Sequence, residues 1–101
     1  MQHQRARFPN YLFRLRRLRC YTQKQFGMLL GLTGKAVSDL EKGRRLPPLL
    51  VALTMELVLG AKLSEIYPDL YGNLGQKAVS REDRLPLRFT RHIRGRVSGN
   101  D

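Results

Sequence analysis

The chain has 101 residues, the size of one small domain with a tail, so it has no room for separate catalytic and regulatory domains. Nineteen Lys and Arg residues against eight Asp and Glu residues give a formal net charge of +11, which indicates a polyanionic partner, nucleic acid before membrane headgroups. The single Cys20 excludes an internal disulfide scaffold, and together with His3 and His92 it does not make a tetrahedral zinc site. We therefore expect neither a metal nor a cofactor.

The sequence shows no sign of membrane insertion or export. Its longest apolar stretch, Leu49 to Leu59, contains Glu56 and is well short of the roughly 20 residues that span a bilayer. Arginines follow the basic N-terminus where a signal peptide needs an apolar stretch. We expect a cytoplasmic protein.

The first two predicted helices are marked by spacing and by capping residues. Apolar residues repeat at three and four positions over 11–18, which predicts a helix capped by Asn10. Thr22 followed by Gln25 fits a capping box and predicts the start of a second helix. Gly31 ends that helix, because glycine adopts the left-handed conformation without a Cβ clash.

Thr33 is placed to cap a third helix, in which Val37 and Leu40 face inward and after which Gly43 ends the pattern. Pro47 and Pro48 suit the opening of a fourth helix. Its helical period is kept up to Gly60 by Leu50, Leu53, Leu57 and Val58. A short fifth turn, Leu63 to Tyr67, stops at Pro68. No period-2 alternation is long enough for a strand, so the sequence predicts an all-α fold of four or five helices.

The C-terminal third is less patterned. An amphipathic helix from Leu70 that includes Leu74, Ala78 and Val79 is only weakly favoured, because Gly72 and Gly75 each cost about 1 kcal/mol against Ala in a helix interior. Residues 85–101 are rich in arginine and are expected to lack fixed structure when free. The predicted organisation is a helical domain over residues 10–67 and an extension over residues 68–101, with a short helix followed by a flexible basic tail.

Two short helices joined by a tight turn containing glycine, with further helices before and after, form a helix-turn-helix arrangement. The segment 15–48 resembles the phage repressor and Cro-like helix-turn-helix (XRE) family, and the resemblance extends to about Ile66. It is carried by Gln23, Gly27, Gly31, Val37, Leu40, Glu41, Gly43 and Pro47. The resemblance implies a lambda-repressor-like fold, sequence-specific binding to double-stranded DNA, and a homodimer.

In this family the residues near the start of the third helix contact base edges in the major groove. The resemblance assigns base contacts to Thr33, Gly34, Lys35, Ser38 and Asp39. Lys35 favours guanine O6 and N7, and Ser38 is nearly indifferent to the base. Asp39 has two interpretations: it accepts a hydrogen bond from cytosine N4, or it instead acts as a cap or pairs with a neighbouring Arg or Lys.

Contacts to the DNA backbone come from basic side chains and helix N-termini. The resemblance assigns them to Gln23, Lys24, Lys42, Arg44 and Arg45. It also matches Arg16 and Glu41 to two positions that form a buried ion pair in relatives; the alternative is a pair of exposed charges, which contributes about 0 to 1 kcal/mol.

Three residues depart from the family pattern. Cys20 replaces a frequent Gly in the first turn, and Gly27 stands where Ala is commonest. Gly34 occupies a position where a polar side chain that contacts a base is usual. It either gives up one contact or lets the protein backbone approach the DNA more closely.

The leading hypothesis is a transcriptional regulator, a repressor that binds an inverted repeat as a dimer with half-sites about 34 Å apart. The self-contacting surface is expected in Leu53 to Tyr67 or in Leu70 to Val79. An alternative is an antitoxin of a toxin–antitoxin pair, which binds its partner through the C-terminal tail and autoregulates through the helix-turn-helix. A third hypothesis is nonspecific nucleic-acid binding, RNA included, by the arginine-rich tail.

We expect no catalytic site. The candidate acid–base residues His3, His92, Glu82 and Asp83 lie in weakly patterned ends of the chain, where no rigid pocket positions them.

Overall fold

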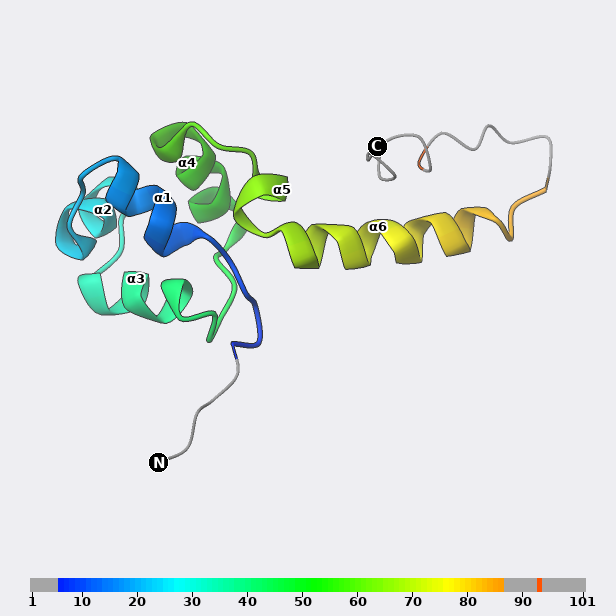
Figure 1. Cartoon of the computed structure of the whole chain (residues 1–101), viewed down its shortest axis with the longest axis horizontal. Helices are drawn as coiled ribbons and strands as arrows, with labels where there is room; N and C mark the ends of the chain where they lie inside the picture. Colours follow the sequence, from blue (N-terminus) through cyan, green and yellow to red (C-terminus); the bar gives the residue numbers. More distant parts are fainter. Residues whose placement is uncertain (1–5, 87–92, 94–101) are drawn as a thin grey trace, which may run out of the picture. The chain divides into compact units, whose positions relative to one another are not determined.

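The computed structural model describes residues 6–86 and residue 93. The chain divides into two compact units, residues 1–68 and 69–101, which are described separately. Within the described residues all the regular secondary structure is helical (Figure 1), which confirms the predicted all-α fold class. The helices are α1 (Leu12–Leu18), α2 (Gln23–Leu30), α3 (Gly34–Glu41), α4 (Leu49–Leu59), α5 (Leu63–Ile66) and α6 (Pro68–Glu82).

The limits of α2 and the start of α3 are fixed by the predicted local chemistry. The Gln25 N–H donates to Thr22 Oγ1 at 3.0 Å, and the Thr22 N–H donates back to Gln25 Oε1 at 2.9 Å, which is a complete capping box. Gly31 ends α2 in the left-handed conformation, with φ of 75°. Thr33 caps α3 by accepting from the Ala36 N–H at 3.1 Å. These predictions are confirmed.

The start of α1 differs from the prediction by one residue. Tyr11, not Asn10, is the N-cap residue, and it makes no side-chain capping bond. The Asn10 side chain instead bridges two elements: its Oδ1 accepts from the Leu12 N–H at 3.0 Å, and its Nδ2 donates to Leu40 O at 2.9 Å. Asn10 therefore joins the start of α1 to the end of α3.

The first turn contains a strained residue. Cys20 has φ of 62° and is the one non-glycine residue with positive φ in the described part of the chain. This conformation costs an L-residue with a Cβ roughly 1–2 kcal/mol. The structure therefore explains why glycine is frequent at this position of the family pattern.

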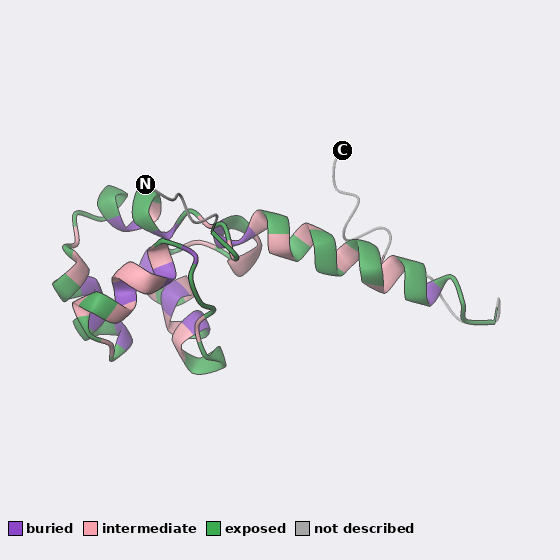
Figure 2. Ribbon diagram, turned by 90° about the horizontal axis from the view of Figure 1, so that it is seen from below, coloured by how far each residue is buried: buried purple, intermediate pink, exposed green. Residues whose placement is uncertain are grey.

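The core of the first unit is formed by apolar side chains from α1 to α5 and from Tyr67, which follows α5. Buried residues, purple in Figure 2, line the facing sides of these helices. They are Leu12, Phe26, Leu30, Val37, Leu40, Ala52, Met55, Leu59, Ile66 and Tyr67. Val37 and Leu40 are the two inward residues predicted for α3, and they fix which side of that helix remains outside.

Gly27 allows the turn between α2 and α3 to close tightly. The Leu32 N–H donates to Gly27 O at 2.7 Å, and a Cβ added to Gly27 would lie 2.6 Å from Leu32 O. That oxygen belongs to the backbone and cannot rotate away. In this chain the close approach of the turn therefore favours glycine at position 27 over a residue with a Cβ.

The predicted period of α4 marks its outer face, not its buried one. Ala52, Met55 and Leu59 are buried, whereas Leu50, Leu53 and Leu57 are 75%, 44% and 84% exposed. Because α4 is apolar around nearly its whole circumference, leucine spacing alone did not determine which face packs inward.

The end of α4 is tied to the end of α1. The Arg19 guanidinium donates to Leu59 O from Nε at 3.2 Å and from Nη2 at 2.9 Å. Gly60 follows with φ of 64°, and a Cβ there would lie 2.6 Å from Arg19 Nη2. Arg19 thus satisfies a carbonyl that the helix end leaves without an intrahelical partner.

In the second unit, α6 is present and longer than the amphipathic helix predicted from Leu70. It begins at Pro68, whose fixed φ suits the first position of a helix, and ends at Glu82. A Cβ added at Gly72 would meet nothing within 4 Å, so packing does not require glycine there. The helix therefore forms even though this glycine lowers its intrinsic stability. The expectation for the basic tail falls mostly on residues 87–92 and 94–101, outside the described residues.

Tyr67 gives the stability of the first unit a dependence on alkaline pH. Burial raises the pKa of Tyr67 to about 12, because the charged phenolate would lose its hydration. In the unfolded chain Tyr67 loses its proton at a lower pH than in the folded protein. Its contribution to the free energy of unfolding is therefore fully present below about pH 10 and falls by about 1.4 kcal/mol per pH unit up to about pH 12. Urea unfolding of wild type and Tyr67→Phe at about pH 9 and pH 11 measures this loss, which the variant lacks. A difference between the two proteins that is independent of pH would contradict the prediction.

Candidate nucleic-acid interface

The outer side of α3 carries the residues predicted to contact bases. Thr33 and Lys35 are exposed, and Gly34, Ser38 and Asp39 are half-buried. Val37 and Leu40 on the opposite side are buried in the core. All five candidate residues therefore lie within two turns at the start of α3, on or beside the side that solvent reaches.

Asp39 is paired with Arg44 in the loop that follows α3. Arg44 Nη1 donates to Asp39 Oδ1 at 2.9 Å, and the Arg44 side chain remains 53% exposed. The structure thus shows the pairing with a neighbouring arginine that the sequence left as one of two interpretations. The pair offsets the negative charge of the one carboxylate among the candidate base contacts.

The candidate backbone contacts flank α3 on both sides. Lys24 on α2 and Lys42 and Arg45 after α3 are exposed. Gln23, the first residue of α2, is half-buried, and its Nε2 donates to Glu41 Oε1 at 3.0 Å. This hydrogen bond connects the start of α2 to Glu41 at the end of α3.

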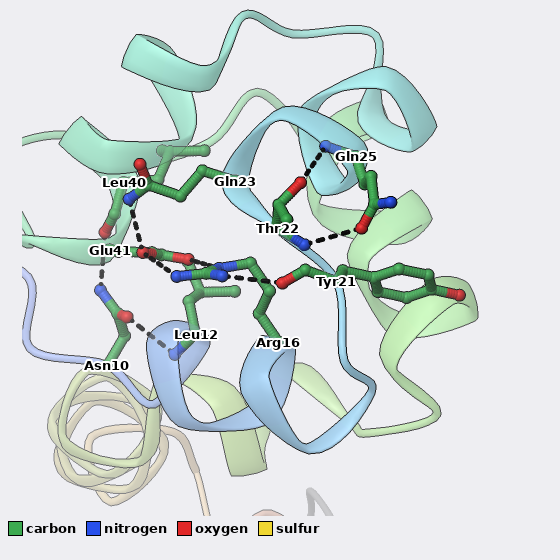
Figure 3. A network of polar contacts seen from close by, with 9 residues as sticks. All are labelled: Asn10, Leu12, Arg16, Tyr21, Thr22, Gln23, Gln25, Leu40 and Glu41. Carbon is green, nitrogen blue, oxygen red and sulfur yellow. Dashed lines mark hydrogen bonds and ion pairs between the residues drawn. The ribbon is translucent and has the colours of Figure 1, made fainter.

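A buried polar network holds the end of α3 (Figure 3). Glu41, the last residue of α3, faces Arg16 of α1, and the two side chains are 4% and 6% exposed. Arg16 donates to both carboxylate oxygens, from Nε to Oε2 and from Nη2 to Oε1 at 3.2 Å. Arg16 Nη1 also donates to Tyr21 O at 2.8 Å. Together with Gln23, the network joins α1, α2 and α3.

Gly34 has room for a side chain. A Cβ added there would lie 3.8 Å from the nearest atoms, Lys24 Cα and N, which is ordinary van der Waals contact. Packing within the protein therefore does not require glycine at this position.

Sequence reasoning missed a contact between the N-terminus and the end of α3. The Phe8 N–H donates to Gly43 O at 3.0 Å. A Cβ added to Gly43 would lie 2.7 Å from Ala6 Cβ and from Phe8 O. Gly43 was predicted only as the residue that ends the third helix, and no local pattern at residues 6–10 indicates this contact.

A model of the helix-turn-helix family HTH_3 matches residues 12–66. No curated protein and no solved structure matches the chain. Because the family match covers more than half of the chain, this protein belongs to the Cro/C1-type, XRE-like helix-turn-helix family. It is a DNA-binding regulator of transcription of that class. In the described residues, no helix is both long enough and apolar enough to cross a membrane.

Two ion pairs of the same domain allow a matched test of the network. Arg16→Ala leaves the Glu41 carboxylate buried without its cation, so we expect a loss of about 3–5 kcal/mol in the free energy of unfolding. Arg44→Ala breaks a largely exposed pair and should cost about 0–1 kcal/mol. Urea unfolding followed by helical circular dichroism measures both. Equal losses would mean that the Arg16–Glu41 pair does not hold the domain together.

Proposed function

We propose that this protein is a cytoplasmic repressor that binds an inverted-repeat operator as a homodimer, with α3 of each copy in the major groove of one half-site. The observation that carries the proposal is the fixed placement of α3. Thr33 caps its start, Val37 and Leu40 anchor its inner side, and Glu41 ties its end to α1 and α2. A helix held in this way presents its outer residues to DNA with little loss of freedom on binding.

Lys35 is the main determinant of sequence preference in this proposal. It is exposed on the first turn of α3, and its ammonium group is suited to guanine O6 and N7. Thr33, Gly34 and Ser38 complete the contact surface near it. Asp39 keeps Oδ2 for a cytosine N4 amino group while Arg44 holds Oδ1, and this pairing reduces repulsion from nearby phosphates.

The backbone contacts set the register of the protein on the duplex. The cationic side chains belong to residues on both sides of α3, and Gln23 and the amides at the start of α2 add uncharged donors. The side-chain contacts proposed are Gln23, Lys24, Lys42, Arg44 and Arg45. The excess of positive charge in the chain supports this arrangement.

The proposed homodimer uses the outer face of α4. Leu50, Leu53 and Leu57 are spaced by three and four residues, so they lie along one face of the helix, and all three are exposed. Exposed apolar side chains gathered in this way mark an interaction surface, and a second copy of the same face gives the two-fold symmetry that an inverted repeat requires.

Leu57→Glu should convert the dimer to a monomer, because it places a charge in the proposed apolar contact, while its 84% exposure means that folding is unaffected. Leu74→Glu is the matched control on α6, where Leu74 is also exposed. Sedimentation equilibrium of both variants and wild type decides the point. Loss of the dimer in Leu74→Glu alone would place the interface on α6, and a monomeric wild type that protects a single half-site would overturn the dimer.

Selection of bound sequences from a random duplex pool at about 150 mM salt tests the function itself. We expect an inverted repeat from wild type, and loss of the preference at one position of each half-site in Lys35→Ala, equivalent to about 1–3 kcal/mol. Lys77→Ala, an exposed lysine of α6, is the control and should select the wild-type sequence. DNA binding without any enriched sequence would overturn the proposal and favour a nonspecific clamp.

The antitoxin alternative depends on the tail, most of which lies outside the described residues. No contact in the described part favours it over the repressor. Deletion of residues 85–101 tests it, because a repressor acting through α3 and α4 loses no activity without the tail, whereas an antitoxin loses the binding of its protein partner. Capture of a stoichiometric protein partner by the tail would favour the antitoxin.

A further inference from the structure

The N-terminal segment, residues 6–10, is fixed against the end of α3. The Phe8 N–H donates to Gly43 O at 3.0 Å, and Asn10 Nδ2 donates to Leu40 O and Phe8 O, each at 2.9 Å. Figure 1 shows the chain before α1, in blue, passing beside the loop that follows α3. The contact with Gly43 is close enough that a Cβ there would collide with Ala6 and Phe8. The segment is therefore built into the domain next to the candidate interface.

Arg7 lies between the two residues that contact Gly43. It is exposed, and its guanidinium carbon lies 5.6 Å from the centroid of the Phe8 ring. Two ion pairs join described residues, Arg16 with Glu41 and Arg44 with Asp39, and neither includes Arg7. The contacts at Gly43 thus bring to the end of α3 a cation that forms no ion pair with any described residue.

The surroundings of Gly43 are strongly positive. Lys42 precedes it and Arg44 and Arg45 follow it, and all three side chains are exposed. Arg44 is paired with Asp39, but the remaining excess of positive charge disfavours the folded state of the free protein, and a polyanion compensates it. Arg7 extends this cluster from the loop after α3 to a second part of the chain.

We propose that Arg7 is a further DNA-binding residue, which contacts a phosphate of the DNA backbone beside the half-site bound by α3. This inference rests on the proposed role of α3. The hydrogen bonds of residues 8 and 10 already hold the backbone around Arg7, so only its side chain is ordered on binding, which lowers the entropic cost of the contact. A phosphate is the matching ligand because guanidinium binds it through several donors without reading the base sequence.

The test measures binding of the full chain to the selected operator duplex and to a scrambled duplex over a range of salt concentrations, by fluorescence anisotropy. Arg7→Ala should lower the slope of log K against log salt by about 0.9 on both duplexes and leave the selected sequence unchanged. Arg7→Lys should keep most of that slope, because the slope follows the number of phosphates neutralised and the substitution keeps the charge.

Arg14→Ala is the matched control. Arg14 is also an exposed arginine stacked on an aromatic ring, 5.5 Å from the centroid of Tyr11. Leu12 and Arg16 face the interior, and Arg14, midway between them along α1, points to the opposite side. The Arg14→Ala substitution removes one positive charge from the same protein without removing the proposed phosphate contact. Equal slope changes for Arg7→Ala and Arg14→Ala would overturn the proposal, because net charge alone would then explain both.

A double-mutant cycle with Asn10→Ala tests whether the anchored segment places Arg7. If it does, the effect of Arg7→Ala on the salt slope should shrink in the Asn10→Ala background, with folding of each variant checked by circular dichroism. An undiminished effect would mean that Arg7 acts without the anchor. Failure of the two proposals is distinguishable: if α3 does not bind DNA, Lys35→Ala has no effect on selection, whereas an inert Arg7 leaves that effect intact.

Discussion

The carboxylate of Glu41 is the point at which the helices around the interface are joined. Burying an unpaired carboxylate costs several kcal/mol, and here Arg16 from α1 and Gln23 from α2 meet that cost with directional hydrogen bonds. Apolar contacts such as those of Val37 and Leu40 favour burial but tolerate small rotations. The hydrogen bonds to Glu41 do not, and they therefore set the orientation of α3 relative to the two helices before it.

Pairing between carboxylates and arginines also determines where charge remains around α3. The two carboxylates of this helix, Asp39 and Glu41, are each held by an arginine, one at the surface and one in the interior. The basic residues around the helix that have no such partner are left to define the electrostatic potential of this side. Arg16 is buried and structural, whereas Arg44 holds Asp39 with a side chain that stays 53% exposed and remains within reach of a polyanion, although both come from the same basic composition.

Local chemistry made much of the fold predictable. Thr22, Gln25, Gly31 and Thr33 act within a few residues of their own positions, so the sequence around them was sufficient to place α2 and α3. The inner face of α4 was not predictable, because a helix that is apolar on every side gives no periodic signal. The bond from Asn10 to Leu40 spans thirty residues and has no local signature either. At the candidate site, the positions on α3 followed from the family pattern, whereas the bond between Asp39 and Arg44 depended on how the loop after the helix folds back.

Gly34 has a consequence for how such a protein changes over generations. The fold has space for a side chain at this position and no packing reason to reject one. Substitutions there are therefore tolerated by the packing of the fold, while they alter the part of α3 that is proposed to contact DNA. Under that proposal, a chain of this kind can acquire a new DNA preference by a single-residue change without first gaining spare stability, so its recognition and its folding are free to evolve separately.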